Sequence, residues 1–195
     1  MASKIDICNL ALSHIGSGEI TSLEDGTQQS SVLGLHYNNC LEMALEIFPW
    51  NFCQRIDVLA LSIKTVPGWQ FVYQYPANCL KVWKVYDAGG YKSDKTNEFR
   101  IISDGINKFV CCRLPEAYAE YSARVNDSSM YSASFVKALS YLLAAEIVNP
   151  LNGNAQKAAE MMQKYQLSVA EAQLSSAVEG IKQSSWTSKY VVGRG

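Results

Sequence analysis

The chain begins with apolar residues at helical spacing. Ile5, Cys8, Leu12 and Ile15 make up this first stripe. The pattern predicts a short amphipathic helix, because residues three or four apart share one face of a helix. Ser3 is suited to cap the start of this helix, and Gly16 is suited to end it.

A second apolar stripe follows a polar loop over 17–26 and predicts a longer helix. This stripe consists of Tyr37, Cys40, Leu41, Ala44, Leu45 and Phe48. Asp25 and Gln28 are three residues apart and resemble a capping box at its start. The helix should stop before Pro49, because proline disfavours helical backbone in the residue that precedes it.

Between 51 and 127 the pattern changes to short runs of β-branched and aromatic residues, which are typical of strands. The expected strands span 56–63, 71–75, 80–86, 99–103, 108–112 and 119–125. Turn chemistry separates them: Asp104-Gly105 predicts a hairpin, and Pro67-Gly68 and Gly89-Gly90 predict two further reversals.

The last of these strands alternates apolar and polar residues. Tyr121, Ala123 and Val125 fall on one face, and Glu120, Ser122 and Arg124 fall on the other. A strict period of two predicts a strand with one buried face and one face in water.

Helical spacing returns after Asp127. The apolar positions of the third helix are Phe135, Leu139, Leu142, Leu143 and Ile147, with several alanines between them. Asn149-Pro150 is expected to end it, and Asn152-Gly153-Asn154 is expected to open a last helix of about 25 residues.

Two helices, a run of strands and two further helices are the order expected when a β region is inserted into a bundle. We therefore predict an α+β fold with a four-helix bundle-like core from 1–50 and 128–182 and an inserted antiparallel β region over 51–127. Residues 183–195 are rich in serine and lack a packed periodicity, which predicts an extended C-terminal arm.

The last helix carries two apolar stripes. One consists of Ala155, Ala158, Met162, Tyr165, Val169 and Ala172. The other consists of Leu167, Ala170, Leu174, Ala177 and Ile181, roughly 140° away on the helix. A surface helix needs one apolar stripe, so the second predicts contact with a neighbouring subunit or partner. The alternative is a helix buried on two sides within one chain.

Composition narrows the classes of function. Seventeen basic residues stand against 18 acidic ones, a net charge of −1, which argues against a protein that grips nucleic acid broadly. Apolar residues make up 48% of the chain and charged residues only 18%, so we expect some surface to be hidden in an assembly. No apolar run is long enough to cross a membrane and no signal peptide is evident at the start, so we expect a soluble, unsecreted protein.

The sequence contains no cluster of the residue types that catalysis or metal binding requires. Six cysteines without metal-ligand spacing are expected to be reduced and buried, with Cys111 and Cys112 on opposite faces of a strand. His14 and His36 have no neighbouring ligands and are expected to be surface or half-buried imidazoles. No catalytic motif occurs, so no catalytic residue, cofactor or metal is expected.

Several motifs, in shared order and spacing, resemble the head-to-tail adaptor proteins of short-tailed phages, the tail tubular protein A family. They include Phe48-Pro49-Trp50-Asn51-Phe52 at a helix end, Pro67-Gly68-Trp69 before an aromatic run, Pro76-Ala77-Asn78-Cys79-Leu80, Tyr121-Ser122-Ala123-Arg124, and Pro150-Leu151-Asn152-Gly153. The resemblance covers about residues 5–180, and it marks Pro49, Trp50, Phe52 and Trp69 as structural positions.

The resemblance implies a homo-oligomeric ring of twelve subunits at the head–tail junction of a virion, assembled in the cytoplasm of the bacterial host. Its bundle would surround the channel through which double-stranded DNA passes without its sequence being read. Its partners would be the portal protein and a tail nozzle similar to tail tubular protein B. It also implies a C-terminal arm along the portal, where Trp186, Tyr190, Val191 and Val192 would anchor.

Two alternatives remain at this stage. One is a head-completion connector of a long-tailed phage, which would share the helical core and the ring. The other is a virion peptidoglycan hydrolase with Glu42 and Glu46, one helical turn apart, as its acid pair. Both glutamates lie on the polar face of the second helix, which favours a solvated surface instead.

Overall fold

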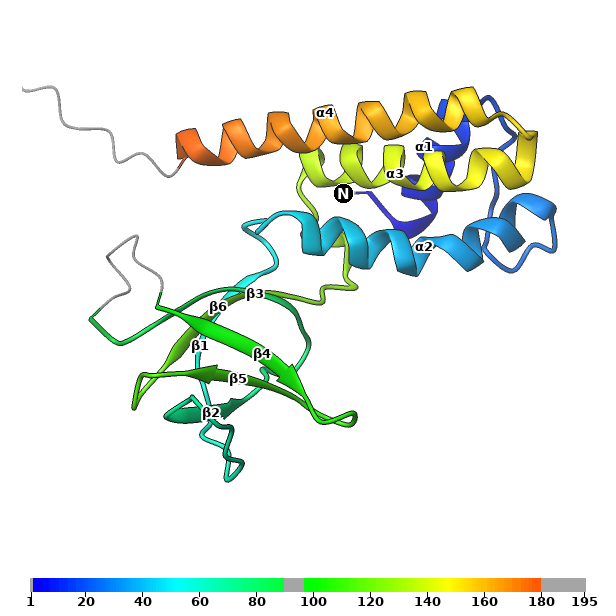
Figure 1. Cartoon of the computed structure of the whole chain (residues 1–195). Coiled ribbons are helices and arrows are strands. Elements are labelled where there is room, and N and C mark those ends of the chain that lie inside the picture. The colour runs from blue at the N-terminus through cyan, green and yellow to red at the C-terminus, as the bar shows by residue number, and fades with distance from the viewer. Residues whose placement is uncertain (1, 90–96, 180–195) are drawn as a thin grey trace, which may run out of the picture.

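The computed structural model describes residues 2–89 and 97–179 and has an α+β fold. Four helices form a bundle, and six strands form two small antiparallel sheets beside it (Figure 1). The helices are α1 (Lys4–Ile15), α2 (Gln28–Ile47), α3 (Ala133–Asn152) and α4 (Ala155–Glu179). Among the described residues, none of these helices is both long and apolar enough to cross a bilayer.

The first two helices begin at polar caps. The Ser3 hydroxyl accepts a hydrogen bond from the backbone N–H of Asp6, whose carboxylate accepts one in return, so the predicted cap is confirmed as a capping box. Gly16 ends α1 in the left-handed region at φ 71°, also as predicted. The capping box predicted at Asp25 is wrong: Thr27 caps α2, and Asp25 instead accepts hydrogen bonds from Thr27.

The end of α3 differs from the prediction. Asn149-Pro150 does not end the helix, which continues to Asn152 and stops at Gly153, a residue with φ 62°. Pro150 has no N–H to donate to the carbonyl four residues earlier, so the helix continues across one missing hydrogen bond. Gly153 closes the last turn by donating its N–H to the Asn149 carbonyl at 2.9 Å. The side chain of Asn154 then accepts from the N–H of Lys157 and opens α4, whose 25 residues confirm the predicted length.

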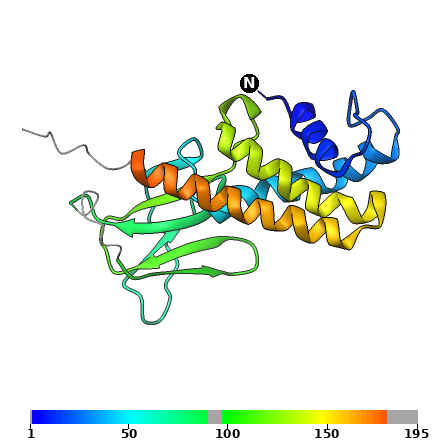
Figure 2. The ribbon, with the colours of Figure 1, turned by 90° about the horizontal axis from the view of Figure 1, so that it is seen from above.

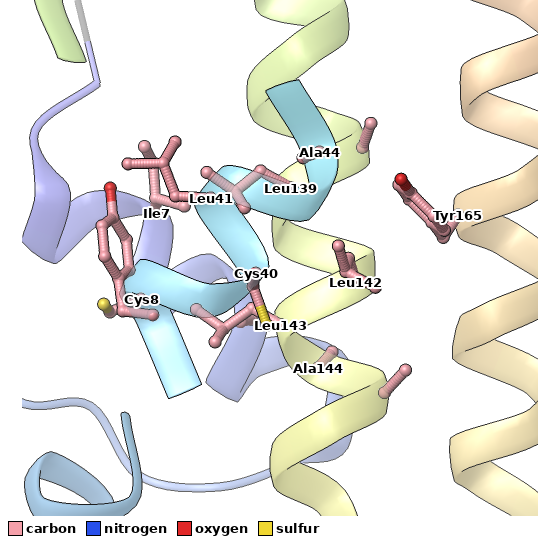
Figure 3. Close-up of a cluster of buried hydrophobic side chains, with 14 of the residues drawn as sticks. Ile7, Cys8, Cys40, Leu41, Ala44, Leu139, Leu142, Leu143, Ala144 and Tyr165 are labelled. Atoms are coloured by element: carbon pink, nitrogen blue, oxygen red, sulfur yellow. The ribbon is translucent and has the colours of Figure 1, made fainter. Parts of the chain in front are cut away.

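Helix α3 is the centre of the bundle. It lies between α2 and α4 in Figure 1, and Figure 2 shows α4 running along it on the side away from α1. Leu139, Leu142 and Leu143 are fully buried, and Figure 3 shows them between side chains of α1, α2 and α4. A helix that is apolar on most of its faces must be covered on several sides, which explains its central place.

The strands form two sheets of three. β1 (Gln54–Val58), β6 (Tyr118–Ala123) and β3 (Cys79–Tyr86) lie in the order β1-β6-β3, and β2 (Phe71–Gln74), β5 (Lys108–Cys112) and β4 (Phe99–Ser103) lie in the order β2-β5-β4. The predicted ranges of β4 and β5 are confirmed. The first strand was expected to reach residue 63, and it ends at Val58 because the chain then leaves β6 and hydrogen-bonds to β2 through Ala60 and Ser62.

The prediction of one wet face for the last strand is wrong at Ser122. This residue is fully buried, and its hydroxyl accepts a hydrogen bond of 2.8 Å from the indole N–H of Trp83. Trp83 belongs to β3, the strand next to β6, and its indole lies over the Ser122 hydroxyl and keeps it out of water.

The bundle and the β region meet at a cluster of aromatic rings. Phe52 and Tyr131 each pack against Phe135 of α3, with ring centroids 4.9 Å apart in both pairs. The guanidinium of Arg124 forms an ion pair of 2.8 Å with Glu42 of α2, and the Lys81 ammonium donates to the Glu46 carbonyl. Both crossings between the two parts of the chain, near 50 and near 130, therefore lie at this cluster.

Candidate functional site

The outer face of α4 is an apolar surface that the rest of the described chain leaves uncovered. Leu167 is 58% exposed and Leu174 is 71% exposed, and Ala170 is exposed between them. These three residues were predicted to contact a neighbouring subunit, and the alternative of burial within one chain is wrong for them. Ile181 and the side chain of Ala177, from the same predicted stripe, lie outside the described residues.

The inner face of α4 packs on the bundle through Tyr165, Val169 and Ala172, as predicted. Met161 is buried in the core, whereas Met162, the residue predicted for that position, is only half-buried. On a helical wheel Met161 lies closer than Met162 to the middle of the buried stripe. Ala155 was also predicted on the stripe, and it is exposed at the first turn of the helix.

The exposed sector around Leu167 and Leu174 contains no charged residue. Placed at 100° per residue, it spans about 120° of the helix. It consists of Ala155, Gln156, Ala159, Gln163, Gln166, Leu167, Ala170, Gln173 and Leu174, all of them exposed. An exposed helix face of leucine, alanine and glutamine is typical of a contact surface, because solvated faces normally carry charge.

The charged side chains of α4 that the structure describes lie beside this sector and are paired within the subunit. Lys164 forms an ion pair of 2.8 Å with Glu160, and Glu171 forms one of 2.9 Å with Lys137 of α3. These pairs connect α4 to itself and to α3. The described side chains of the leucine sector belong neither to these ion pairs nor to the buried core of the bundle.

Three apolar side chains are also exposed on α2. Leu35 is 75% exposed, Ile47 is 50% exposed and Met43 is 46% exposed. A helical wheel places Leu35 between Glu42 and Glu46, and it places Ile47 beside the buried Cys40, about 120° from Leu35. These side chains therefore do not form one continuous apolar stripe like that of α4.

The two histidines lie at the surface of the bundle, as expected. The half-buried ring of His14 stacks on Tyr141, and its Nε2 lies 3.1 Å from the Ser140 hydroxyl. Burial lowers the pKa of His14, and Lys164 and Lys157 of α4 lower it further. His36 lies 4.0 Å from Glu146.

The described residues contain no group of three or more His, Cys, Asp or Glu side chains that could hold a metal ion. Glu42, one of the two acids of the hydrolase alternative, is held in the ion pair with Arg124, and Glu46 points its exposed side chain away from the bundle core. Nothing in this arrangement favours an acid pair around a substrate.

The six cysteines are free thiols. Burial raises the pKa of Cys8 to about 11 and that of Cys40 to about 12, so these thiols remain protonated near neutral pH. Cys111 and Cys112 belong to different apolar clusters, which confirms that they point to opposite faces of β5.

Three of the four structural positions named by the motifs, Pro49, Trp50 and Phe52, lie where the bundle and the β region join. Trp50, directly after Pro49, is 3% exposed, and its ring packs edge-on against Phe135. Phe52 belongs to the same aromatic cluster. Trp69 lies elsewhere, half-buried against a small cluster of Val72 and its neighbours in the second sheet.

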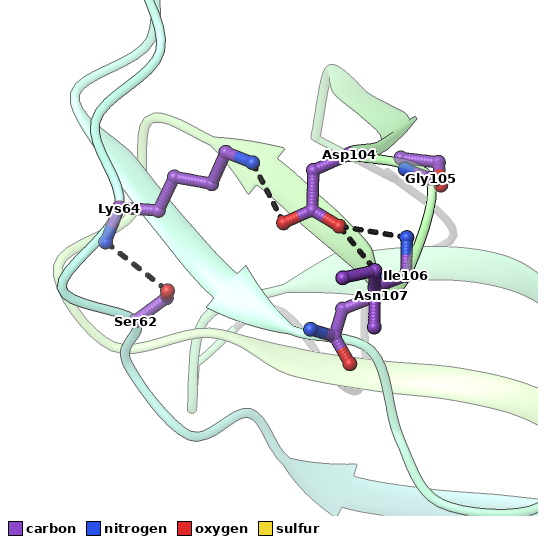
Figure 4. A network of polar contacts seen from close by, with 7 residues as sticks. Ser62, Lys64, Asp104, Gly105, Ile106 and Asn107 are labelled. Atoms are coloured by element: carbon purple, nitrogen blue, oxygen red, sulfur yellow. Dashed lines mark hydrogen bonds and ion pairs between the residues drawn. The ribbon is translucent and has the colours of Figure 1, made fainter.

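The loop tips of the β region carry two further exposed apolar residues, Ile63 and Ile106. Lys64 and Asp104 join their loops through an ion pair of 2.9 Å, and Asp104 also accepts from the N–H groups of Ile106 and Asn107 (Figure 4). The hairpin predicted at Asp104-Gly105 is thereby confirmed, and the turn at Pro67-Gly68 is confirmed too.

No protein-family model matches this chain, and no curated protein matches it. The predicted portal contacts, Trp186, Tyr190, Val191 and Val192, lie outside the described residues.

Proposed function

We propose that this chain is a structural ring protein of a short-tailed phage, which joins the portal to the tail nozzle and forms part of the channel for double-stranded DNA. It has no enzymatic role in this proposal. It acts at the head–tail junction of the virion after assembly in the host cytoplasm. The observation that carries the proposal is the exposed, charge-free face of α4 around Leu167 and Leu174.

A face of this kind needs a partner. Leu167 and Leu174 are both more than half exposed, with glutamine and alanine around them. Contact between their apolar side chains and water is unfavourable in free energy. Packing α4 against another subunit would remove that surface from water. Assembly therefore supplies the stabilisation that the isolated subunit lacks.

The motif resemblance supports the same proposal. Its segment from Phe48 to Phe52 forms the aromatic junction between the bundle and the β region. The motif residues therefore hold together the two parts that a related adaptor protein would also have to join. The aromatic-rich β region favours an adaptor of a short-tailed phage over a connector of a long-tailed one.

The charge of the chain is compatible with DNA passage. A net charge of −1 gives the ring no general attraction for phosphates, and a strongly basic channel would retain the genome that it must release. In this proposal the arm over 183–195 attaches the ring to the portal.

The test is a measurement of size and composition. The purified full chain is mixed with the portal protein of the same genome and analysed by native mass spectrometry and sedimentation. We expect one closed ring of this chain on each portal ring. A chain that stays monomeric and does not bind the portal contradicts the proposal.

A further inference from the structure

The sheet of β1, β6 and β3 leaves apolar side chains exposed on its outer face. Its inner face, which includes Val85 and Ala119, packs in the apolar cluster between the two sheets. Residues that pair directly across a sheet share a face, so Val58, Tyr118 and Tyr86 lie together on the outer side. Val58 is 58% exposed there. This part of the outer face is therefore open to a further apolar contact.

A hollow of about 360 Å³ lies on this outer face, lined by Ile56, Tyr86, Ala88 and Tyr118. The rings of Tyr86 and Tyr118 are parallel, with their centroids 6.4 Å apart. The hollow is at the small end of the range for ligand sites, so it has room for one bulky side chain rather than for a folded partner. Its apolar lining favours an aromatic or aliphatic side chain.

The rim of the hollow carries carboxylates. Glu116 accepts a hydrogen bond of 3.4 Å from the Tyr118 hydroxyl, and Asp87 directly precedes Ala88. Glu120 is the partner of Ile56 across the sheet, and Lys84, 4.0 Å away, offsets its charge. An apolar hollow beside an excess of carboxylates is complementary to a basic segment with a bulky apolar side chain.

The segment that follows α4 has this complementary composition. Residues 180–195 lie outside the described part of the chain, and their sequence has no acidic residue. The basic residues of the segment are Lys182, Lys189 and Arg194. Trp186 and Tyr190 stand among them, an even number of residues apart, so they share one side of an extended chain.

The segment starts within reach of the hollow. Figures 1 and 2 both show the end of α4 on the same side of the molecule as the end of β3, which leads to Ala88. An extended chain spans about 3.3 Å per residue, so the segment can reach about 50 Å from α4. In its sheet β1 pairs with β6 alone, and the other edge of an edge strand can pair with an extended segment.

We infer that, before any partner binds, residues 186–192 lie along the outer edge of β1 in the same chain, with the Trp186 ring in the hollow. Lys182 and Lys189 then lie near the carboxylates of the rim. The arm covers a surface hollow in this arrangement, so the buried clusters form without it. The inference goes beyond the proposed function, because it concerns the free chain. In the proposed ring, the portal competes with the hollow for the same arm.

Cross-linking in the full chain, without the portal, tests the inference. Val58→Cys is combined with Thr187→Cys, and a short bis-maleimide joins the two thiols if the arm lies along β1. Thr65→Cys with Thr187→Cys is the matched control, because Thr65 is exposed on a loop of the same β region. The wild-type chain measures the background from the native thiols, of which Cys79 is half-buried and the others are buried.

We expect a severalfold higher yield of cross-links within one chain from the pair 58 and 187 than from the control pair. Trp186→Ala and Lys189→Glu should each remove most of this excess. The yield should also fall at about 1 M salt, where the Debye length is about 3 Å. Equal yields from the two pairs, cross-links mainly between different copies, or an excess that survives Trp186→Ala overturn the inference.

Addition of the portal protein separates this inference from the proposed function. The cross-link between 58 and 187 should decline once the portal binds, because the arm then moves to the portal. A chain that gives the cross-link and does not bind the portal supports the inference and contradicts the proposed function. A chain that binds the portal but never gives the cross-link overturns the inference and leaves the proposed function standing.

Discussion

The indole N–H of Trp50 donates a hydrogen bond of 2.8 Å to the backbone carbonyl of Ala44, six residues earlier in the chain. Ala44 belongs to the last turns of α2, where carbonyl groups have no partner within the helix. Trp50 therefore closes the end of α2 while its ring fills the space beside Phe135. The contacts of Trp50 thereby fix where the chain leaves α2 and enters the β region.

Trp50→Ala should lower the free energy of unfolding by about 3 to 5 kcal/mol, because it removes a buried ring and leaves the Ala44 carbonyl without its donor. Trp50→Phe should cost less, since it retains most of the ring. Denaturant unfolding followed by circular dichroism measures both. Equal stability of Trp50→Ala and wild type would show that the ring does not support the junction.

Leu174→Glu should leave the subunit folded and impair assembly. The side chain is 71% exposed, so the change in the free energy of unfolding should stay within about 0.5 kcal/mol. The concentration for half-assembly should rise about tenfold or more, which corresponds to about 1.4 kcal/mol. Thr65→Glu adds the same charge to an exposed loop of the β region and is the matched control. Normal assembly of Leu174→Glu would remove the α4 face from the contact.

Stability should fall as the pH drops below 6.5 because of His14. Burial depresses its pKa in the folded chain below the ordinary value of 6.5. Below pH 6.5 the unfolded chain therefore binds a proton that the folded chain does not, and protonation favours unfolding. The stabilising effect of the neutral ring is complete above pH 6.5 and declines as the pH falls toward the depressed value.

The test compares the free energy of unfolding at about pH 7.5 and pH 5.5 in wild type, His14→Gln and His36→Gln. His14→Gln should show a smaller loss between the two pH values than wild type, and His36→Gln should retain the part that His14 causes. An unchanged loss in His14→Gln would mean that its ring is solvated in the native protein.

Deletion of 184–195 should leave the fold intact and weaken attachment to the portal. The buried bundle core of the described residues ends at Ala172, before the deleted segment begins, so we expect the core to form without that segment. We expect an unchanged melting temperature and loss of co-sedimentation with the portal. Failure of the shortened chain to fold would place part of the core in the arm.

Local patterns predicted the elements better than the contacts between them. β4 and β5 were found with their observed ends because Asp104-Gly105 interrupts two clear runs, and α1 was found because Ser3 and Gly16 bracket its stripe. These signals act within a few residues. Pro150 was read as a stop because proline interrupts the hydrogen bonds of a helix, yet the helix continues for two more residues to Asn152.

Errors arose where distant parts of the chain meet. Ser122 falls on the polar side of the alternating pattern in β6. It is nevertheless buried, because the indole of Trp83, from the neighbouring strand β3, packs against it. Met161 replaced Met162 because the rotation of α4 follows from its packing on α3. The outer face of α4 was predicted because its second apolar stripe is visible in the sequence of that helix alone.

The central claim is that neighbouring copies cover the exposed leucines of α4. A cryo-EM reconstruction of this chain assembled on the portal protein tests it most directly. The account predicts a closed ring in which Leu167 and Leu174 of each copy are buried against a neighbouring copy. A ring in which these two leucines remain in water, or separate copies with no contact at α4, would contradict it.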